Sequence, residues 1–149
     1  MGAKIIPSIR YIDCKKAVDW LCEAFGFEEH LIVPSDTGGI LHAQLVYQDR
    51  MVMLGSAHEG DEFGRLNSSP LELEGQNTAS VYLVVDDADA HYQKAISCGA
   101  EIIFDIKDED YGGRGYVCKD LEGQYGALAL MTLGLNFYFL FLALNSLAF

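Results

Sequence analysis

The sequence has few basic residues and no charge-rich arm. Its 149 residues include 22 aspartates and glutamates against 10 lysines and arginines, which gives a formal net charge of −12. A chain this acidic repels phosphate backbones, so we expect no nucleic-acid partner. No run of five or six like charges is present either, which argues against a disordered charged tail.

The sequence also lacks a metal-binding cysteine pattern. Cys14, Cys22, Cys98 and Cys118 form no C-x-x-C pair, and their spacing matches no zinc site. No basic stretch followed by an apolar one precedes the first predicted strand, so no secretory signal is visible. Thiols without a pairing pattern are typical of a reducing compartment, and we expect a cytoplasmic protein.

Charge is missing from the C-terminal end. No charged residue follows Glu122, and residues 127–149 are long enough to span a membrane. The first eight of them fit the last strand of the domain, which leaves an apolar tail, 135–149, with no basic anchor after it. We expect this tail to pack against the domain or a partner subunit. A membrane tail and a shifted reading frame at the 3′ end are the alternatives.

What is present predicts one globular domain with a repeated unit. Half of the residues are hydrophobic and 21% are charged. In the first half, Asp13 can cap a helix over 15–25, whose apolar residues recur with a helical period, and Gly26 can end it. The alternation of apolar residues predicts strands over 4–12, 27–33, 40–47 and 51–55.

The second half repeats this order. Asp86 or Asp87 can cap a helix over 88–98, and Gly99 can end it. Asp13 and Asp86, like Gly26 and Gly99, lie 73 positions apart. Strands are predicted over 79–85, 100–106, 113–120 and 124–131. The fold class is therefore α+β, with two paired β-α-β-β-β modules whose curved sheets surround a cavity.

These modules set the predicted domain organisation. We expect one domain over 1–134, with the first module at about 4–55 and the second at about 79–134. The linker between them, 56–78, is rich in glycine, serine, asparagine and acids. A connection this long usually covers a site or is disordered. The sheet faces that carry no helix would together form a half-open cavity.

Four stretches resemble a known superfamily: "IPSIRYIDCKKAVDWLCEAFGFEEH", "HAQLVYQDRMVMLGS", "SVYLVVDDADAHYQKAISCGAEI" and "DYGGRGYVCKDLEGQYG". They resemble the vicinal oxygen chelate superfamily, which includes glyoxalase I, bleomycin-resistance proteins, fosfomycin-resistance enzymes and extradiol dioxygenases. The nearest likeness is to small bacterial glyoxalase/bleomycin resistance proteins, partly PhnB-like. The resemblance covers about 5–130 and implies the fold and a homodimer. It does not specify the reaction, because this scaffold carries many chemistries.

Metal-using members of that superfamily take four ligands from strands facing the cavity. By the resemblance, these positions fall here on Ile6 or Ser8, on Gln44, on Ser80 and on Ala127. Gln44 is the one plausible ligand, since a divalent site needs several nitrogen or oxygen donors. A shift of one residue brings in no better donor. The sequence therefore predicts no metal cofactor, which weighs against glyoxalase-type or dioxygenase-type catalysis.

Polar residues on the predicted inner faces are candidate ligand contacts. His42 and Gln44 lie two residues apart on one strand and share a face. Arg10 shares a face with Ser8 and would hold a carboxylate or phosphonate if it pointed inward. The alternative interpretations are a hydrogen-bonded pair at the sheet rim for the first two and a salt bridge for Arg10.

Arg114 and Tyr116 form a second candidate pair in the segment "GGRGY". They share a strand face, and Arg114 is a candidate for closing over an anion. A hairpin irregularity with a solvated arginine explains the pattern equally well. His91 lies on the second predicted helix, where an exposed position is the default expectation.

The sequence thus predicts a metal-free protein that binds a small molecule between its modules. The predicted ligand contacts are Ser8, Arg10, His42, Gln44, Ser80, Arg114 and Tyr116, and no catalytic residue is assigned. The alternative is a divalent-metal-dependent lyase, isomerase or dioxygenase of the same superfamily. A third option is an interaction protein whose apolar tail docks on a partner or a membrane.

Overall fold

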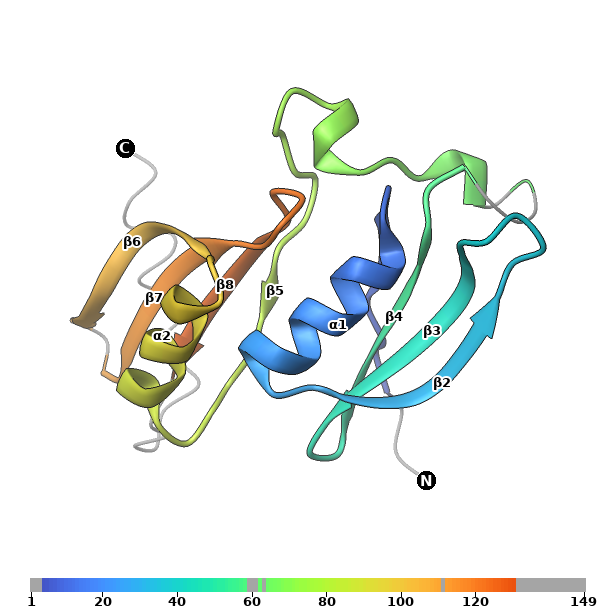
Figure 1. Ribbon diagram of the computed structural model, residues 1–149. Coiled ribbons are helices and arrows are strands. Elements are labelled where there is room, and N and C mark those ends of the chain that lie inside the picture. The colour runs from blue at the N-terminus through green and yellow to red at the C-terminus, as the bar shows by residue number, and fades with distance from the viewer. Residues whose placement is uncertain (1–3, 59–61, 63, 111, 131–149) are drawn as a thin grey trace.

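The computed structural model describes residues 4–58, 62, 64–110 and 112–130. Two modules lie side by side, each a four-stranded sheet with a helix on one face (Figure 1). The first contains β1 (Ser8–Tyr11), α1 (Cys14–Phe25), β2 (Glu28–Pro34), β3 (Ile40–Tyr47) and β4 (Arg50–Ser56). The second contains β5 (Val81–Tyr82), α2 (Ala88–Ser97), β6 (Glu101–Asp108), β7 (Arg114–Lys119) and β8 (Tyr125–Leu130).

The two sheets have the same strand order, which confirms the repeat. The orders are β1-β4-β3-β2 and β5-β8-β7-β6, with the first strand of each module parallel to the last and the other pairs antiparallel. The predicted α+β fold of two β-α-β-β-β modules is therefore confirmed. Each sheet stays open, and β1 and β5 are edge strands that face each other across the junction.

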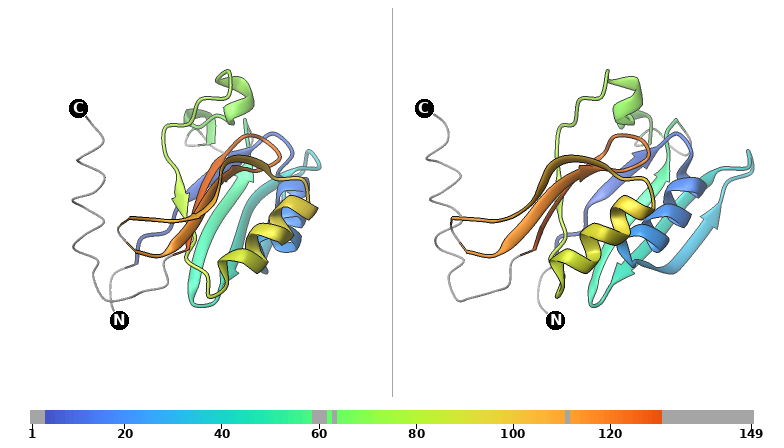
Figure 2. Two further views of the ribbon diagram at one scale, coloured as in Figure 1. Left: turned by 90° about the vertical axis from the view of Figure 1, so that its left-hand side faces the viewer. Right: turned by 60° about the vertical axis from the view of Figure 1, so that its left-hand side comes forward.

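The helices lie next to each other on one side of the molecule (Figure 2). Helix α1 is capped by Asp13, whose side chain accepts from Lys16 N at 3.0 Å, and ends at Gly26 with a φ of 75°. Its apolar face, with Val18 and Leu21, packs on the buried side chains of the first sheet. Between modules, Trp20 Nε1 donates to the carbonyl of Cys98 at 2.7 Å.

Helix α2 begins one residue later than the constant spacing of the repeat predicts. Asp87, not Asp86, is its N-cap and accepts from Ala90 N at 3.0 Å. The offset between the caps is therefore 74 positions, whereas Gly26 and Gly99 remain 73 apart. Either aspartate suits the role chemically, so the backbone path into α2 decides which one is used.

Strands β1 and β5 are shorter than predicted. The sequence predicted strands over 4–12 and 79–85, but regular pairing covers 8–11 and 81–82. Each of these strands has a hydrogen-bonded neighbour on one side alone, and a short edge strand leaves few backbone groups unpaired. Their other sides border the space between the modules.

The described part of the linker lies over the junction, where residues from both of its halves line the space between the modules (Figure 1). It contains the short 3-10 helices η1 (Gly64–Leu66) and η2 (Pro70–Glu72). Ser69 and Glu72 form a capping box at the start of η2. No helix in the described ranges is long and apolar enough to cross a membrane. The predicted tail, 135–149, lies outside the described residues.

Candidate functional site

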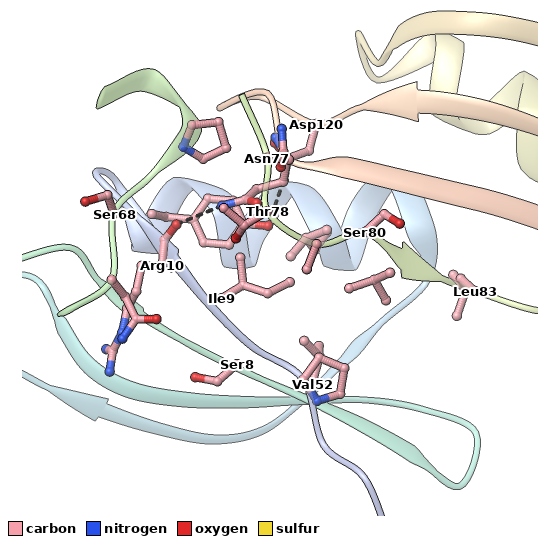
Figure 3. Close-up of a pocket in the computed structure, with 18 of the residues that line it drawn as sticks. Ser8, Ile9, Arg10, Val52, Ser68, Asn77, Thr78, Ser80, Leu83 and Asp120 are labelled. Carbon is pink, nitrogen blue, oxygen red and sulfur yellow. Dashed lines mark hydrogen bonds between the residues drawn. The ribbon is translucent and has the colours of Figure 1, made fainter. Parts of the chain in front are cut away.

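A pocket of about 450 Å³ lies between the modules, where the edge strands β1 and β5 face each other under the linker (Figure 3). Its wall is largely apolar and includes Ile9, Leu21, Phe25, Val52 and Leu83. These side chains come from β1, α1, β4 and the segment after β5, so the pocket exists because the two modules pack together. Neither module alone would enclose it.

Linker side chains supply much of the polar lining. These are Asn67, Ser68, Gln76, Asn77 and Thr78. The amide of Asn77 donates to the carbonyl of Gly123 at 2.9 Å, which ties the linker to the β7–β8 turn. The sequence predicted that this connection covers a site or is disordered, but it named none of these residues. The feature of the sequence that could have indicated them is the high content of amide and hydroxyl side chains in a long connection.

A hydrogen-bonded group of side chains forms one end of the pocket. Tyr11 donates its hydroxyl to Asp120 at 2.7 Å, and Asp120 also accepts from the backbone N–H groups of Glu122 and Gln124 at 2.9 Å. Burial raises the pKa of the Asp120 carboxyl above its ordinary value, while these hydrogen bonds oppose the rise. Burial and the neighbouring Asp120 raise the pKa of Tyr11. The hydrogen-bond acceptors of the Asp120 carboxylate are thus already used by groups of the protein.

Glu122 lies next to the same end of the pocket, outside its lining, and connects the segments that form it. Its buried carboxylate accepts from the backbone N–H groups of Ile12 and Asp13 and from the hydroxyl of Ser69, each at 2.7 Å. These contacts join the β7–β8 turn to the start of α1 and to the linker. A buried carboxylate needs such partners, and here they connect three segments distant in sequence.

Two of the predicted contact residues, Ser8 and Arg10, line the pocket from β1. They alternate with Ile9 and Tyr11, which pack toward α1, so Ser8 and Arg10 lie on the open face of the first sheet. Ser80, the predicted contact from the second module, lines the pocket on the opposite side. In Figure 3, Arg10 and Ser80 lie toward opposite ends of the pocket.

His42 and Gln44 lie on the same open face, next to the pocket rather than in its lining. Their flanking residues Ala43 and Leu45 are fully buried toward α1. Gln44 Nε2 lies 3.1 Å from His42 Nε2, so the predicted hydrogen-bonded pair is present. The register pairs Gln44 with Met53 and Met53 with Ser8, which puts Gln44 and Ser8 in one row across the sheet.

Arg114 and Tyr116 are placed away from the pocket. Arg114 binds Asp89 of α2 through Nε at 2.9 Å and Nη2 at 3.0 Å, and Asp108 through Nη1 at 3.0 Å. These carboxylates raise the pKa of the guanidinium. Tyr116 is buried beneath α2. The two residues do share a face, as predicted, but it is the face that α2 covers.

His91 is more enclosed than its place on a helix suggested. Its Nδ1 lies 2.8 Å from the hydroxyl of Tyr116, and its Nε2 lies 3.4 Å from the carbonyl of Phe25 in the other module. Its ring packs against Phe25 with centroids 5.3 Å apart. Burial lowers the pKa of His91 below its ordinary value, partly offset by the Phe25 carbonyl. The expected exposed position is therefore wrong.

The residues at the superfamily's metal positions do not fit a divalent ion. Ile6 and Ala127 offer no donor atom, Ser8 and Ser80 offer neutral hydroxyls, and only Gln44 offers an amide oxygen. In the ranges that the structure describes, no three His, Cys, Asp or Glu side chains gather as a metal site would require.

Comparisons with known proteins place these features among relatives. Residues 6–125 match the family model described as the Glyoxalase/Bleomycin resistance protein/Dioxygenase superfamily. The uncharacterized protein Mb0911c of Mycobacterium bovis is 30% identical over 122 residues, which are 82% of this chain and 79% of that protein.

Two solved structures show the same fold. TioX from Micromonospora sp. ML1 superposes with a TM-score of 0.69 at 29% identity and covers 87% of this chain and 98% of its own. TnmS3 from Streptomyces sp. CB03234, described as an antibiotic binding protein, has a TM-score of 0.62 at 20% identity. That match covers 89% of this chain and 99% of TnmS3.

Proposed function

Because the chain belongs to the glyoxalase/bleomycin resistance protein/dioxygenase superfamily, we propose that it binds a small, largely apolar molecule in the pocket between its modules. We further propose that binding needs no metal ion. The pocket itself is the observation that carries this proposal. A volume of about 450 Å³ falls within the usual range of ligand sites, as does an apolar wall with a few polar groups.

The arrangement of polar groups also supports binding rather than catalysis. Asp120 accepts hydrogen bonds from the hydroxyl of Tyr11 and from two backbone N–H groups, so its carboxylate is already occupied within the protein. Hydroxyls and amides at the rim, with Ser8 and Ser80 on opposite walls, suit the orientation of a ligand. An antibiotic binding protein on the same fold shows that this scaffold is used for small-molecule binding elsewhere.

The predicted contacts divide into three groups under this proposal. Ser8, Arg10 and Ser80 would touch a ligand within the pocket. His42 and Gln44 would touch one that extends over the open face of the first sheet. Arg114 and Tyr116, which lie on the α2 side of the second sheet, have no part in it.

N-phenyl-1-naphthylamine, a neutral and fluorescent aromatic amine, tests the proposal. We expect saturable binding of one probe per pocket, seen as a rise in fluorescence. Ser80→Trp would fill the pocket and should weaken binding at least about tenfold. Ser97→Trp, at an exposed site on α2 outside the pocket lining, is the matched control and should bind normally. Absence of saturable binding, or equal affinity in both variants, would refute the proposal.

The alternative, a divalent-metal-dependent lyase, isomerase or dioxygenase, is separated by a second measurement. Dialysis against EDTA should leave probe affinity unchanged, because the residues at the family's metal positions lack ligand atoms. Elemental analysis of protein purified without chelator should find well below one metal ion per chain. Stoichiometric zinc, nickel, manganese or iron would favour the alternative.

A further inference from the structure

The Arg10 side chain crosses the open face of the first sheet directly over Gly55. Arg10 and Gly55 are partners in the parallel pairing of β1 with β4. A Cβ built on Gly55 would lie 2.0 Å from Arg10 Nη1 and 3.1 Å from Arg10 Cζ. The guanidinium therefore occupies the space that any other side chain at position 55 would fill. Extending the β3–β4 register by one residue places His42 opposite Gly55, on the same face.

This guanidinium has no acidic partner in the described part of the chain. The ion pairs there involve other basic residues. Arg10 Nε is buried and makes no hydrogen bond. Acids outnumber bases 22 to 10 in this protein, so a solitary arginine at a pocket is not explained by a shortage of carboxylates. A partly buried cation without a partner is costly unless something else binds it.

The rest of the pocket defines what kind of molecule would meet Arg10. Among the described residues of the lining, Arg10 and Asp120 are the charged ones, and Asp120 is already bonded to Tyr11 and the backbone. In Figure 3 the Arg10 side chain points away from Asp120. One end of the pocket thus offers a free positive charge, whereas its middle offers Ile9, Val52 and Leu83.

We propose that the ligand carries an anionic group, a carboxylate or a phosphate, which the guanidinium of Arg10 binds, and an apolar body that fills the pocket. This inference rests on the proposed function. The terminal Nη atoms would form the contact, since Nε is enclosed. A planar guanidinium suits two-pronged binding of such an anion better than an ammonium does. Gly55 allows the guanidinium to take this position, because it has no side chain that would occupy the same space.

A pair of probes that differ by one anionic group tests the proposal. 8-Anilino-1-naphthalenesulfonate is N-phenyl-1-naphthylamine with an added sulfonate, which stands in for the carboxylate or phosphate. We expect Arg10→Gln to weaken binding of the sulfonate about ten- to a hundredfold and to change binding of the neutral amine less than twofold. Arg50→Gln removes an exposed arginine that pairs with Asp49 and should change neither affinity.

Gly55→Ala separates geometry from overall charge. The added methyl group would displace the guanidinium without altering the net charge, so we expect it to reduce sulfonate affinity as Arg10→Gln does. Thermal unfolding should show that both variants are folded. If the neutral probe binds but Arg10→Gln leaves sulfonate affinity unchanged, this inference fails while the proposed function stands. If neither probe binds the wild-type protein, the proposed function fails first.

Discussion

At the scale of single residues, several contacts between the modules are hydrogen bonds made by polar side chains. His91 is an example, because it receives the Tyr116 hydroxyl on Nδ1 and faces the Phe25 carbonyl of the other module with Nε2. Both contacts are satisfied by the neutral ring. Protonation would turn Nδ1 into a donor and lose its role as acceptor for Tyr116.

This state of His91 predicts how stability depends on pH. Burial lowers its pKa in the folded protein below the ordinary 6.5, so the unfolded chain takes up a proton first as pH falls. The stability contributed by neutral His91 is therefore present above pH 6.5 and is lost as pH falls toward the folded pKa.

Urea unfolding at pH 7.5 and pH 5.5 measures this loss. His91→Gln should show a smaller loss of unfolding free energy between the two pH values than the wild-type protein. At pH 7.5 the variant should cost about 1 kcal/mol, since one hydrogen bond is weakened. His30→Gln, at an exposed position in β2, serves as control. An unchanged pH dependence in His91→Gln would contradict the assignment.

At the scale of elements, the two equivalent hairpin turns of the repeat make different numbers of contacts with the rest of the protein. In the β7–β8 turn, the buried carboxylate of Glu122 accepts hydrogen bonds from Ile12, Asp13 and Ser69. The corresponding β3–β4 turn offers one exposed contact, from Gln48 to Asp86 at 3.4 Å. The stronger fastening lies beside the pocket, where it holds β1 and the linker in position.

Removing the charge of Glu122 should loosen this fastening. In Glu122→Gln, the amide nitrogen replaces one acceptor oxygen, so one donor among two N–H groups and a hydroxyl loses its partner. Hydrogen bonds to charged groups contribute about 1.5–3 kcal/mol, and we expect a loss of about 2 kcal/mol in unfolding free energy. Chemical denaturation measures it, with the exposed Glu28→Gln as control. A loss equal to that of the control would mean that the three contacts contribute little.

The elements themselves were largely predictable from sequence, and the reason is local. Capping residues and apolar periods are properties of neighbouring positions, so the ends of α1 and α2 were all predicted to within one residue. Pairing between strands is not local, so the two-residue length of β5 could not be predicted from its neighbouring positions.

The candidate site was predictable in part for the same reason. Alternation showed that Arg114 and Tyr116 share a face but not that α2 covers it. Ser8 and Ser80 were predicted from the resemblance to known proteins, and Arg10 because it shares a strand face with Ser8. All three line the pocket. The linker residues had no periodicity from which a position could be derived. Gly55 was missed because a glycine in a strand has several explanations.

At the scale of the whole molecule, each sheet has one broad face that neither α1 nor α2 covers (Figure 2). Leu31 shares the open face of the first sheet with its partner Gln44 and is 44% exposed. Phe104, paired with Val117 on the open face of the second sheet, is 63% exposed. Covering these two side chains with a second copy of the chain would be favourable, because it removes apolar surface from water.

We therefore expect a homodimer, as the family resemblance also implies. Light scattering coupled to size exclusion should give twice the chain mass of 16.4 kDa at micromolar concentration. A double variant with Leu31→Glu and Phe104→Glu should shift the protein to the monomer, because each buried carboxylate would lack a partner. Leu66→Glu, at an 81% exposed site in η1, should remain dimeric. A wild-type monomer, or a double variant that stays dimeric, would show that these faces are not the interface.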